Sequence, residues 1–176
     1  MRIVFMIMSG MMLLSCSVKE YYGDLHSGDQ VIVNHELVIP ANDARVSIQN
    51  GVVRKYTQLD YYYPHCWLVS QRREAEPQII IPGRFNIVGI RHKYETVMKQ
   101  TGGYLLSAFA SGASLTAVEY ITELTIYSES QSAISRLYCS HWEDPFDAEH
   151  LSLEQMRKTL SPLVSIVQKK NTLPVQ

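Results

Sequence analysis

Two short motifs place cysteine and histidine side chains next to each other in this chain. They are His65-Cys66 and Cys139-Ser140-His141. If the two segments met in the fold, they would offer a Cys₂His₂ set for zinc, but structural zinc sites usually take their cysteines from tight CxxC-like pairs, which this chain lacks. A free Cys66 beside a histidine could also act as a thiol nucleophile. Because no GxSxG motif or phosphate-binding glycine pattern is present, we predict no catalytic residue, no metal and no cofactor.

Carboxylates and histidines are concentrated in residues 141–150, HWEDPFDAEH. A hard cation could bind these oxygens, although the segment has neither the register nor the glycine of an EF-hand loop. The alternative is a solvated acidic loop before a helix that begins near Ser152, where negative charge suits the N-terminal end of the helix dipole. We expect the solvated loop.

Aromatic residues gather in the segment DYYYPHCW, residues 60–67. Such rings can bind a sugar or a peptide, but they more often close the end of a β core. Any ligand-binding role would fall to Tyr61, Tyr62, Tyr63 and Trp67.

The N-terminal segment MRIVFMIMSGMMLLSC has the order of a secretory signal. Arg2 supplies positive charge, residues 3–14 form an apolar core, and the small Ser15 precedes Cys16. The core is shorter than the roughly 20 apolar residues of a spanning helix. An ordinary cleaved signal or an uncleaved anchor would explain the apolar run but would leave Cys16 as a coincidence.

The Leu14-Ser15-Cys16 ending resembles the lipobox of bacterial lipoproteins. The resemblance implies that residues 1–15 are removed, that Cys16 is acylated (with palmitate among the acyl groups), and that residues 16–29 hold the domain off the bilayer. Ser17 follows the cysteine in place of Asp, which in enterobacterial-type sorting favours the outer membrane, with the domain facing the periplasm.

A wider pattern also resembles known proteins. The runs IPANDARVSIQNG and DYYYPHC, followed by a late Cys139 before a C-terminal helix, are similar to small uncharacterised proteobacterial lipoproteins. This resemblance implies no established activity.

Cys66 and Cys139 remain once Cys16 is assigned to the lipid. Two leftover cysteines in an oxidising compartment predict one disulfide. Its Cα atoms should lie roughly 4.4–6.8 Å apart. The chain-entropy model credits a loop of this length with about 4 kcal/mol of stability.

Charge limits the kinds of partner that this chain can bind, and length limits the number of its domains. The chain has 176 residues, with 16 basic and 17 acidic side chains and a formal net charge of −1. Such a balance predicts neither nucleic-acid binding nor a polybasic membrane patch, so the membrane contact would come from the lipid. We predict one domain over residues 30–170 and a short tail over residues 171–176.

Alternating apolar and polar residues predict strands along most of this domain, and Asn50-Gly51 predicts a tight hairpin turn. Because no long helix separates these strands, we predict a mainly β fold: an antiparallel sandwich or partly open barrel with one C-terminal α-helix. The predicted strands cover residues 30–39, 45–49, 52–56, 66–71, 79–81, 85–90, 117–127 and 134–141.

Two segments differ from the strand pattern. Ser152 and Gln155 have the spacing of a capping box, and an apolar stripe from Leu153 to Val167 predicts a helix that Pro162 kinks or ends. Residues 101–114 are rich in small side chains, and we expect a mobile, partly exposed contact surface there; the alternative is a strand or helix packed on the core.

These observations lead to three functional hypotheses. The first is a lipid-anchored, non-catalytic accessory or interaction module with an envelope protein as partner. The second is a periplasmic β barrel or sandwich that binds a small ligand near Tyr61 and Trp67. The third is an envelope hydrolase, which would require a nucleophile and a base within hydrogen-bond distance.

Overall fold

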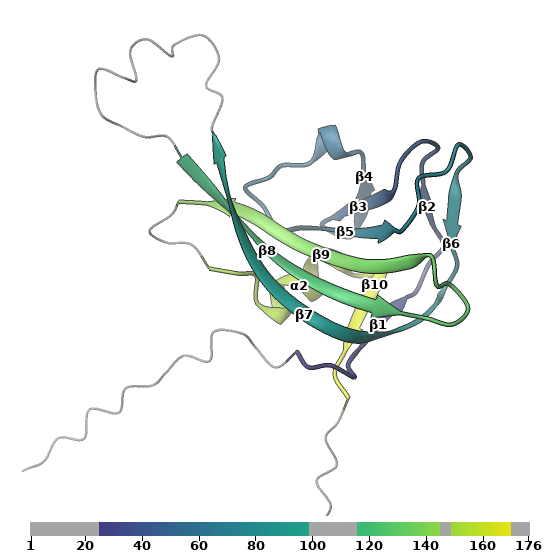
Figure 1. Ribbon diagram of the computed structural model, residues 1–176. Helices are drawn as coiled ribbons and strands as arrows, with labels where there is room; N and C mark the ends of the chain where they lie inside the picture. The colour runs from purple at the N-terminus through teal and green to yellow at the C-terminus, as the bar shows by residue number, and fades with distance from the viewer. Residues whose placement is uncertain (1–24, 99–115, 145–148, 170–176) are drawn as a thin grey trace, which may run out of the picture.

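The computed structural model describes residues 25–98, 116–144 and 149–169 (Figure 1). Several predicted features lie outside these ranges: the signal segment 1–15, Cys16, most of the tether, residues 101–114 and the tail 171–176. Within the described ranges, no helix is both long and apolar enough to cross a membrane.

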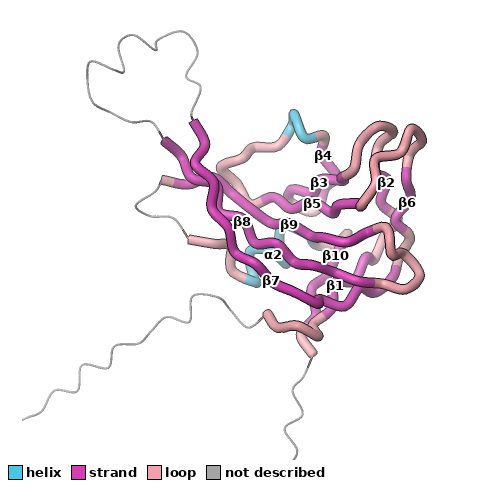
Figure 2. The backbone as a smooth tube through the Cα atoms, in the orientation of Figure 1, coloured by secondary structure: helices cyan, strands magenta, loops and turns pink. Residues whose placement is uncertain are grey.

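Strands dominate the described residues, and eight of them form one antiparallel sheet that curls into a half-barrel (Figure 1). Their spatial order is β10-β1-β7-β8-β9-β5-β3-β4, while β2 and β6 form a separate two-stranded sheet. Figure 2 shows how little of the described chain is helical. The prediction of a mainly β, antiparallel fold is therefore confirmed. The strands are β1 (Gln30–Val33), β2 (Leu37–Ile39), β3 (Arg45–Gln49), β4 (Val52–Arg54), β5 (His65–Ser70), β6 (Gln78–Ile80), β7 (Gly83–Met98), β8 (Thr116–Tyr127), β9 (Ile134–Glu143) and β10 (Val164–Val167).

The strand predicted over residues 30–39 is two strands. The chain leaves the large sheet after β1, where the Asn34 amide donates to the Leu163 carbonyl at 2.8 Å, and β2 then joins β6. The side chains predicted to share one face, Val31, Val33, Leu37 and Ile39, are nevertheless all buried. Alternation predicted which side chains point inward, but it could not show that the strand is interrupted.

β7 is longer than the predicted strand over residues 85–90. It continues through the polar Arg91, His92 and Lys93 to Met98 because β8 pairs with it from Asn86 to Met98. A bulge at Val88 shifts the register, so that Ile87 and Ile90 both face inward although their separation is odd.

Asn50-Gly51 forms the predicted hairpin turn between β3 and β4. Both residues have positive φ, 53° for Asn50 and 72° for Gly51, as a type I′ turn requires. The turn packs on the end of the helix, and the Gly51 amide donates to the Thr159 carbonyl at 2.8 Å. A Cβ on Gly51 would lie only 2.1 Å from the Ser161 carbonyl oxygen, so this position requires glycine for space as well as for φ.

The helix α2 spans Leu153–Leu160 and carries the predicted capping box. Ser152 N donates to Gln155 Oε1 at 2.8 Å, and Gln155 N donates to Ser152 Oγ at 3.2 Å. Of the two effects predicted for Pro162, a kink or an end of the helix, the structure shows the second, but the last part of the apolar stripe is a strand. The helix ends before Pro162, and the next residues form β10, which pairs with β1.

The large sheet has two faces with different surroundings. Its inner face carries Cys66, Leu68 and Leu137 and packs against α2 in the hydrophobic core. Its outer face carries the alternating residues of the same strands, including Trp67 and Tyr138.

The predicted disulfide between Cys66 and Cys139 is present. The two cysteines face each other in register on β5 and β9. Their Cα atoms are 4.0 Å apart, closer than the predicted range, because the strands they belong to are direct neighbours in the sheet.

Candidate ligand-binding site

A hollow of about 260 Å³ lies on the outer face of the sheet, opposite the core. Strands β3, β5, β7, β8 and β9 supply its floor, and the segment between β4 and β5 supplies one wall. We call it the outer hollow. Its lining residues are Arg45, Tyr56, Tyr61, His65, Trp67, Lys93, Glu95, Glu119, Ile121 and Tyr138.

Stacked rings cross the floor of the outer hollow. Trp67 and Tyr138 are paired across β5 and β9, and their rings stack with centroids 5.2 Å apart. His65, two residues before Trp67 on the same face, stacks on it at 5.6 Å. Tyr61 meets the edge of His65 at 5.4 Å and stacks on Trp142 at 4.7 Å. The alternation of β5 and its register with β9 therefore bring Tyr138, Trp67 and His65 into one row, which Tyr61 extends from the segment before β5.

Charged groups surround these rings. The Arg45 guanidinium carbon lies 3.9 Å from the centroid of the Tyr56 ring, a cation–π contact. On the β7 side, Lys93 forms an ion pair with the buried Glu123, whose other oxygen lies 3.4 Å from Arg136 Nε. The outer hollow thus combines apolar ring faces with groups of both charges.

The pKa of the Glu123 carboxyl is lowered despite its burial. Burial acts to raise this pKa, but the hydrogen bond from Lys93 and the positive charges of Lys93, Arg136 and Arg91 outweigh it. This ion cluster fixes Lys93 at the edge of the outer hollow.

Three linked hydrogen bonds connect the His65 ring to the residues around it. His65 Nδ1 is 3.0 Å from the Tyr63 carbonyl oxygen, and His65 Nε2 is 3.1 Å from Ser140 Oγ. Ser140 Oγ is also 2.7 Å from Glu119 Oε1. His65 and Ser140 are direct partners in the β5–β9 pairing, which brings them together from distant parts of the sequence.

The hydrogen atoms available to these three hydrogen bonds can be counted. A carbonyl only accepts, so His65 Nδ1 must carry a hydrogen, and the Ser140 hydroxyl supplies one more. The third hydrogen bond requires either a second N–H on His65 or a protonated Glu119. Burial lowers the pKa of His65, partly offset by the Tyr63 hydrogen bond and the charge of Glu119, so the neutral ring is favoured. A neutral His65 beside a carboxylate leaves Ser140 with one hydrogen for two acceptors.

Tyr61 is also tied into this wall. Its hydroxyl donates to the Tyr56 carbonyl at 3.0 Å. Burial, followed by interaction with the Tyr56 side chain, raises the pKa of Tyr61. The phenol therefore stays neutral and acts as a structural donor.

The geometry argues against both catalytic hypotheses, the hydrolase and the thiol nucleophile. Ser140 and His65 lie within hydrogen-bond distance of each other, but Ser140 is 0% exposed and its hydroxyl already contacts both His65 and Glu119. It cannot reach a substrate carbon from there. The disulfide occupies both Cys66 and Cys139, which excludes the thiol nucleophile and leaves neither sulfur for zinc.

The predicted ligand-binding residues divide into two pairs. Tyr61 and Trp67 line the outer hollow. Tyr62 and Tyr63 do not, and they are 46% and 62% exposed. The sequence patterns did not single out Arg45, Tyr56, Glu119 and Tyr138, among others. The alternation of β8 and β9 places Glu119 and Tyr138 on the outer face, but it does not place them beside Trp67.

The acidic segment 141–150 is described only in part, because residues 145–148 lie outside the described ranges. His141 Nε2 lies 2.8 Å from Glu143 Oε2, and Asp144 and Glu149 are exposed. Among the described residues, no three histidine, cysteine or carboxylate side chains are arranged to hold a metal ion.

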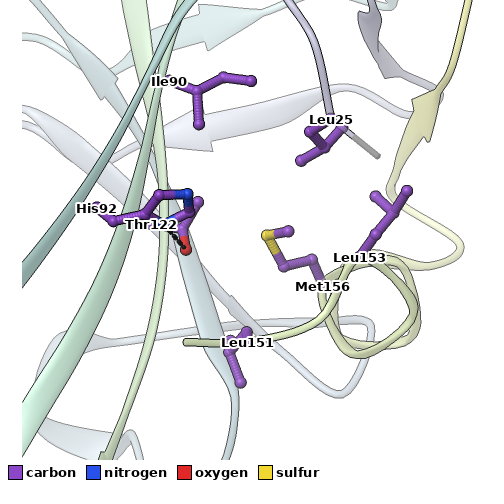
Figure 3. Close-up of a pocket in the computed structure, with 7 residues that line it drawn as sticks. All are labelled: Leu25, Ile90, His92, Thr122, Leu151, Leu153 and Met156. Atoms are coloured by element: carbon purple, nitrogen blue, oxygen red, sulfur yellow. Dashed lines mark hydrogen bonds between the residues drawn. The ribbon is translucent and has the colours of Figure 1, made fainter. Parts of the chain in front are cut away.

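A second cavity lies on the inner face, between the sheet and α2 (Figure 3). Met156 of α2 points toward Thr122 and His92, whose Oγ1 and Nδ1 atoms are 3.3 Å apart. The volume is about 30 Å³, far below the roughly 300–1,000 Å³ of small-molecule sites. This cavity is a gap in core packing, so the outer hollow is the better candidate site.

No protein-family model, no curated protein and no solved structure matches this chain.

Proposed function

We propose that this protein is a lipid-anchored protein of the cell envelope whose β domain is a non-catalytic binding module. It binds a small polar ligand with an apolar ring face, such as a sugar, in the outer hollow. Cys16 carries the lipid, and the domain faces the periplasm from the outer membrane.

The observation that carries this proposal is the row of rings with charged groups on either side. The faces of Trp67 and Tyr138 suit the C–H face of a sugar ring, while Arg45, Glu95 and Glu119 can bond its hydroxyls. The volume of about 260 Å³ lies just below the roughly 300–1,000 Å³ of small-molecule sites, so a ligand of one or two rings fits best. Full burial of Ser140 and oxidation of both domain cysteines favour binding over catalysis.

Ligand binding is tested on the full chain in detergent by titration with a panel of neutral and charged mono- and disaccharides, followed by tryptophan fluorescence. Trp67→Ala should weaken binding at least about tenfold, since a buried aromatic contact is typically worth more than 1 kcal/mol. Tyr94→Ala is the matched control, because Tyr94 is exposed and does not line the outer hollow. Equal affinities of the two variants, or no binding by the wild-type chain, would refute the ligand-binding proposal.

The anchor is tested separately. Intact-mass analysis of the mature protein should show an acylated N-terminus that begins at Cys16, and Cys16→Ser should abolish it. An unmodified thiol at Cys16 would refute the anchor and leave the binding proposal standing.

A further inference from the structure

Two carboxylates oppose each other across β7 and β8 in the outer hollow. Glu95 and Glu119 both line the hollow, and they are direct partners in the β7–β8 pairing. The side chains of direct partners lie on the same face of a sheet with their Cβ atoms roughly 4.5–5.5 Å apart, so two like charges in this arrangement destabilise the pairing. A positive charge between the two carboxylates would remove this repulsion.

The protein itself leaves the two carboxylates without a cation. Within the described part of the chain, neither Glu95 nor Glu119 takes part in an ion pair. The two cations that line the hollow have other contacts, because Lys93 forms its ion pair with Glu123 and the Arg45 guanidinium lies over a tyrosine ring. The negative charge of Glu95 and Glu119 is therefore open to a ligand.

The hydrogen bonds around Ser140 also favour a donor at Glu119. Ser140 Oγ lies 2.7 Å from Glu119 Oε1 and 3.1 Å from His65 Nε2, so its one hydrogen goes to the nearer carboxylate. His65 lines the hollow and is 1% exposed, and its Nε2 atom is then left without a donor. A ligand N–H that donates to Glu119 shares the charge of this carboxylate and frees the Ser140 hydrogen for His65.

The aromatic rings of the outer hollow suit a ligand that carries this N–H as an ammonium group. Tyr61, Trp67 and Tyr138 line the hollow, and aromatic side chains attract organic cations. A metal ion fits less well, because among the described residues no three histidine, cysteine or carboxylate side chains are grouped to hold one. An ammonium group on an organic ring can contact the carboxylates and the aromatic side chains together.

We propose that the ligand of the outer hollow is an amino sugar whose ammonium group binds between Glu95 and Glu119. The sugar ring lies against Trp67 and Tyr138. The ammonium group donates to both carboxylates, removes their repulsion and supplies the hydrogen that the contacts around Ser140 lack. This inference rests on the proposed function, the binding of a sugar in the outer hollow, and names the class of sugar.

The probes are glucosamine, glucose and N-acetylglucosamine, each titrated against the full chain in detergent and followed by tryptophan fluorescence. Glucosamine carries an ammonium group where glucose has a hydroxyl, and N-acetylglucosamine keeps the nitrogen without its charge. The protein variants are Glu119→Gln and Glu95→Gln, which keep the size of the side chain and remove its charge. Glu36→Gln is the matched control, because Glu36 is exposed and does not line the outer hollow.

We expect glucosamine to bind the wild type at least about tenfold more tightly than either neutral sugar, since hydrogen bonds between charged groups are roughly twice as strong as those between neutral groups. Glu119→Gln should weaken the binding of glucosamine about tenfold, and Glu95→Gln should weaken it in the same direction. Both variants should bind glucose as the wild type does, which an unfolded variant could not do. Glu36→Gln should match the wild type with all three sugars.

The outcomes separate this inference from the proposed function. Equal affinities of the wild type for glucosamine and glucose would overturn the inference and leave sugar binding intact. Equal affinities for glucosamine and N-acetylglucosamine would overturn the requirement for a positive charge. Binding of glucosamine that neither glutamine substitution weakens would overturn the position of the ammonium group. Failure of every sugar to bind would refute the proposed function itself, and this inference with it.

Discussion

At the residue scale, the contacts from Glu119 through Ser140 to His65 have fewer hydrogen atoms than hydrogen bonds. The lowered pKa of His65, caused chiefly by burial, keeps the ring neutral at pH 7.5. Ser140 then has one hydrogen for two acceptors at 3.1 and 2.7 Å. A donor at position 119 would complete all three hydrogen bonds without an additional proton.

Glu119→Gln supplies that donor, because a carboxamide NH₂ can donate to Ser140 Oγ. Ser140 can then donate to His65 Nε2, and His65 Nδ1 to Tyr63. We expect this variant to raise the free energy of unfolding at pH 7.5 by about 1 kcal/mol, the value of one typical hydrogen bond. The measurement is urea unfolding of the full chain, with Glu95→Gln, an exposed neighbour, as the control for charge. A loss of stability in Glu119→Gln alone would contradict the hydrogen count.

At the element scale, the β3–β4 turn and the end of α2 depend on each other. Gly51 lies against Ser161, and its amide caps the Thr159 carbonyl, so the hairpin and the helix end must form together. β10 follows directly after this junction. It pairs with β1 and is the edge strand at the opposite end of the large sheet from β4.

Gly51→Ala should therefore destabilise the domain by at least about 2 kcal/mol, since it adds a close contact to the cost of a positive φ. Gly28→Ala is the matched control: its φ is +103° but no atom lies within 4 Å of the added Cβ. The Gly28→Ala variant should lose only the free energy that a positive φ costs an alanine, about 1 kcal/mol. Thermal unfolding measures the loss of stability in both variants. Equal losses would contradict the prediction, because they would mean that a small backbone shift relieves the contact with Ser161.

At the scale of the whole molecule, several histidines are held neutral by the fold. Burial lowers the pKa of His65, His92 and His150, and for His150 the charges of His92 and His141 lower it further, to about 4. A pKa lowered from the ordinary 6.5 means that the unfolded chain binds more protons between these two values. The stability that these groups contribute is complete above about pH 6.5 and is lost as the pH falls below it, for His150 down to about pH 4.

His150→Gln should flatten this acid loss. We expect the drop in unfolding free energy between pH 7 and pH 4.5 to shrink by about 1 kcal/mol, a figure discounted because His150 is only partly buried. The exposed His35 serves as control in a His35→Gln variant, which should keep the wild-type slope. Urea unfolding at both pH values gives the comparison, and an unchanged slope in His150→Gln would contradict the assignment.

The outer hollow shows how far sequence reasoning extends to a site. The sequence singled out residues 60–67 for a possible binding role, and Tyr61 and Trp67 of this segment line the outer hollow. Arg45, Glu119 and Tyr138 could not be assigned to the same site because they belong to other strands, and only the pairing of those strands brings them beside Trp67.

The sequence by itself determined the elements whose signals are local. Alternation marked most strands and their buried faces, Asn50-Gly51 marked a turn by its φ requirement, and Ser152 with Gln155 marked the start of α2. Two domain cysteines sufficed to predict a disulfide. These features depend on neighbouring residues or on chemistry that any fold would share.

Only the tertiary structure decided where long-range contacts override local pattern. Val164 and Val167 fit the predicted helical stripe, but pairing with the open edge of β1 made them part of a strand. β7 continues past its apolar residues because β8 supplies backbone partners as far as Met98. Strand order, the two faces of the sheet and the sites on them follow from hydrogen bonds between distant residues, whose pairing a local pattern does not contain.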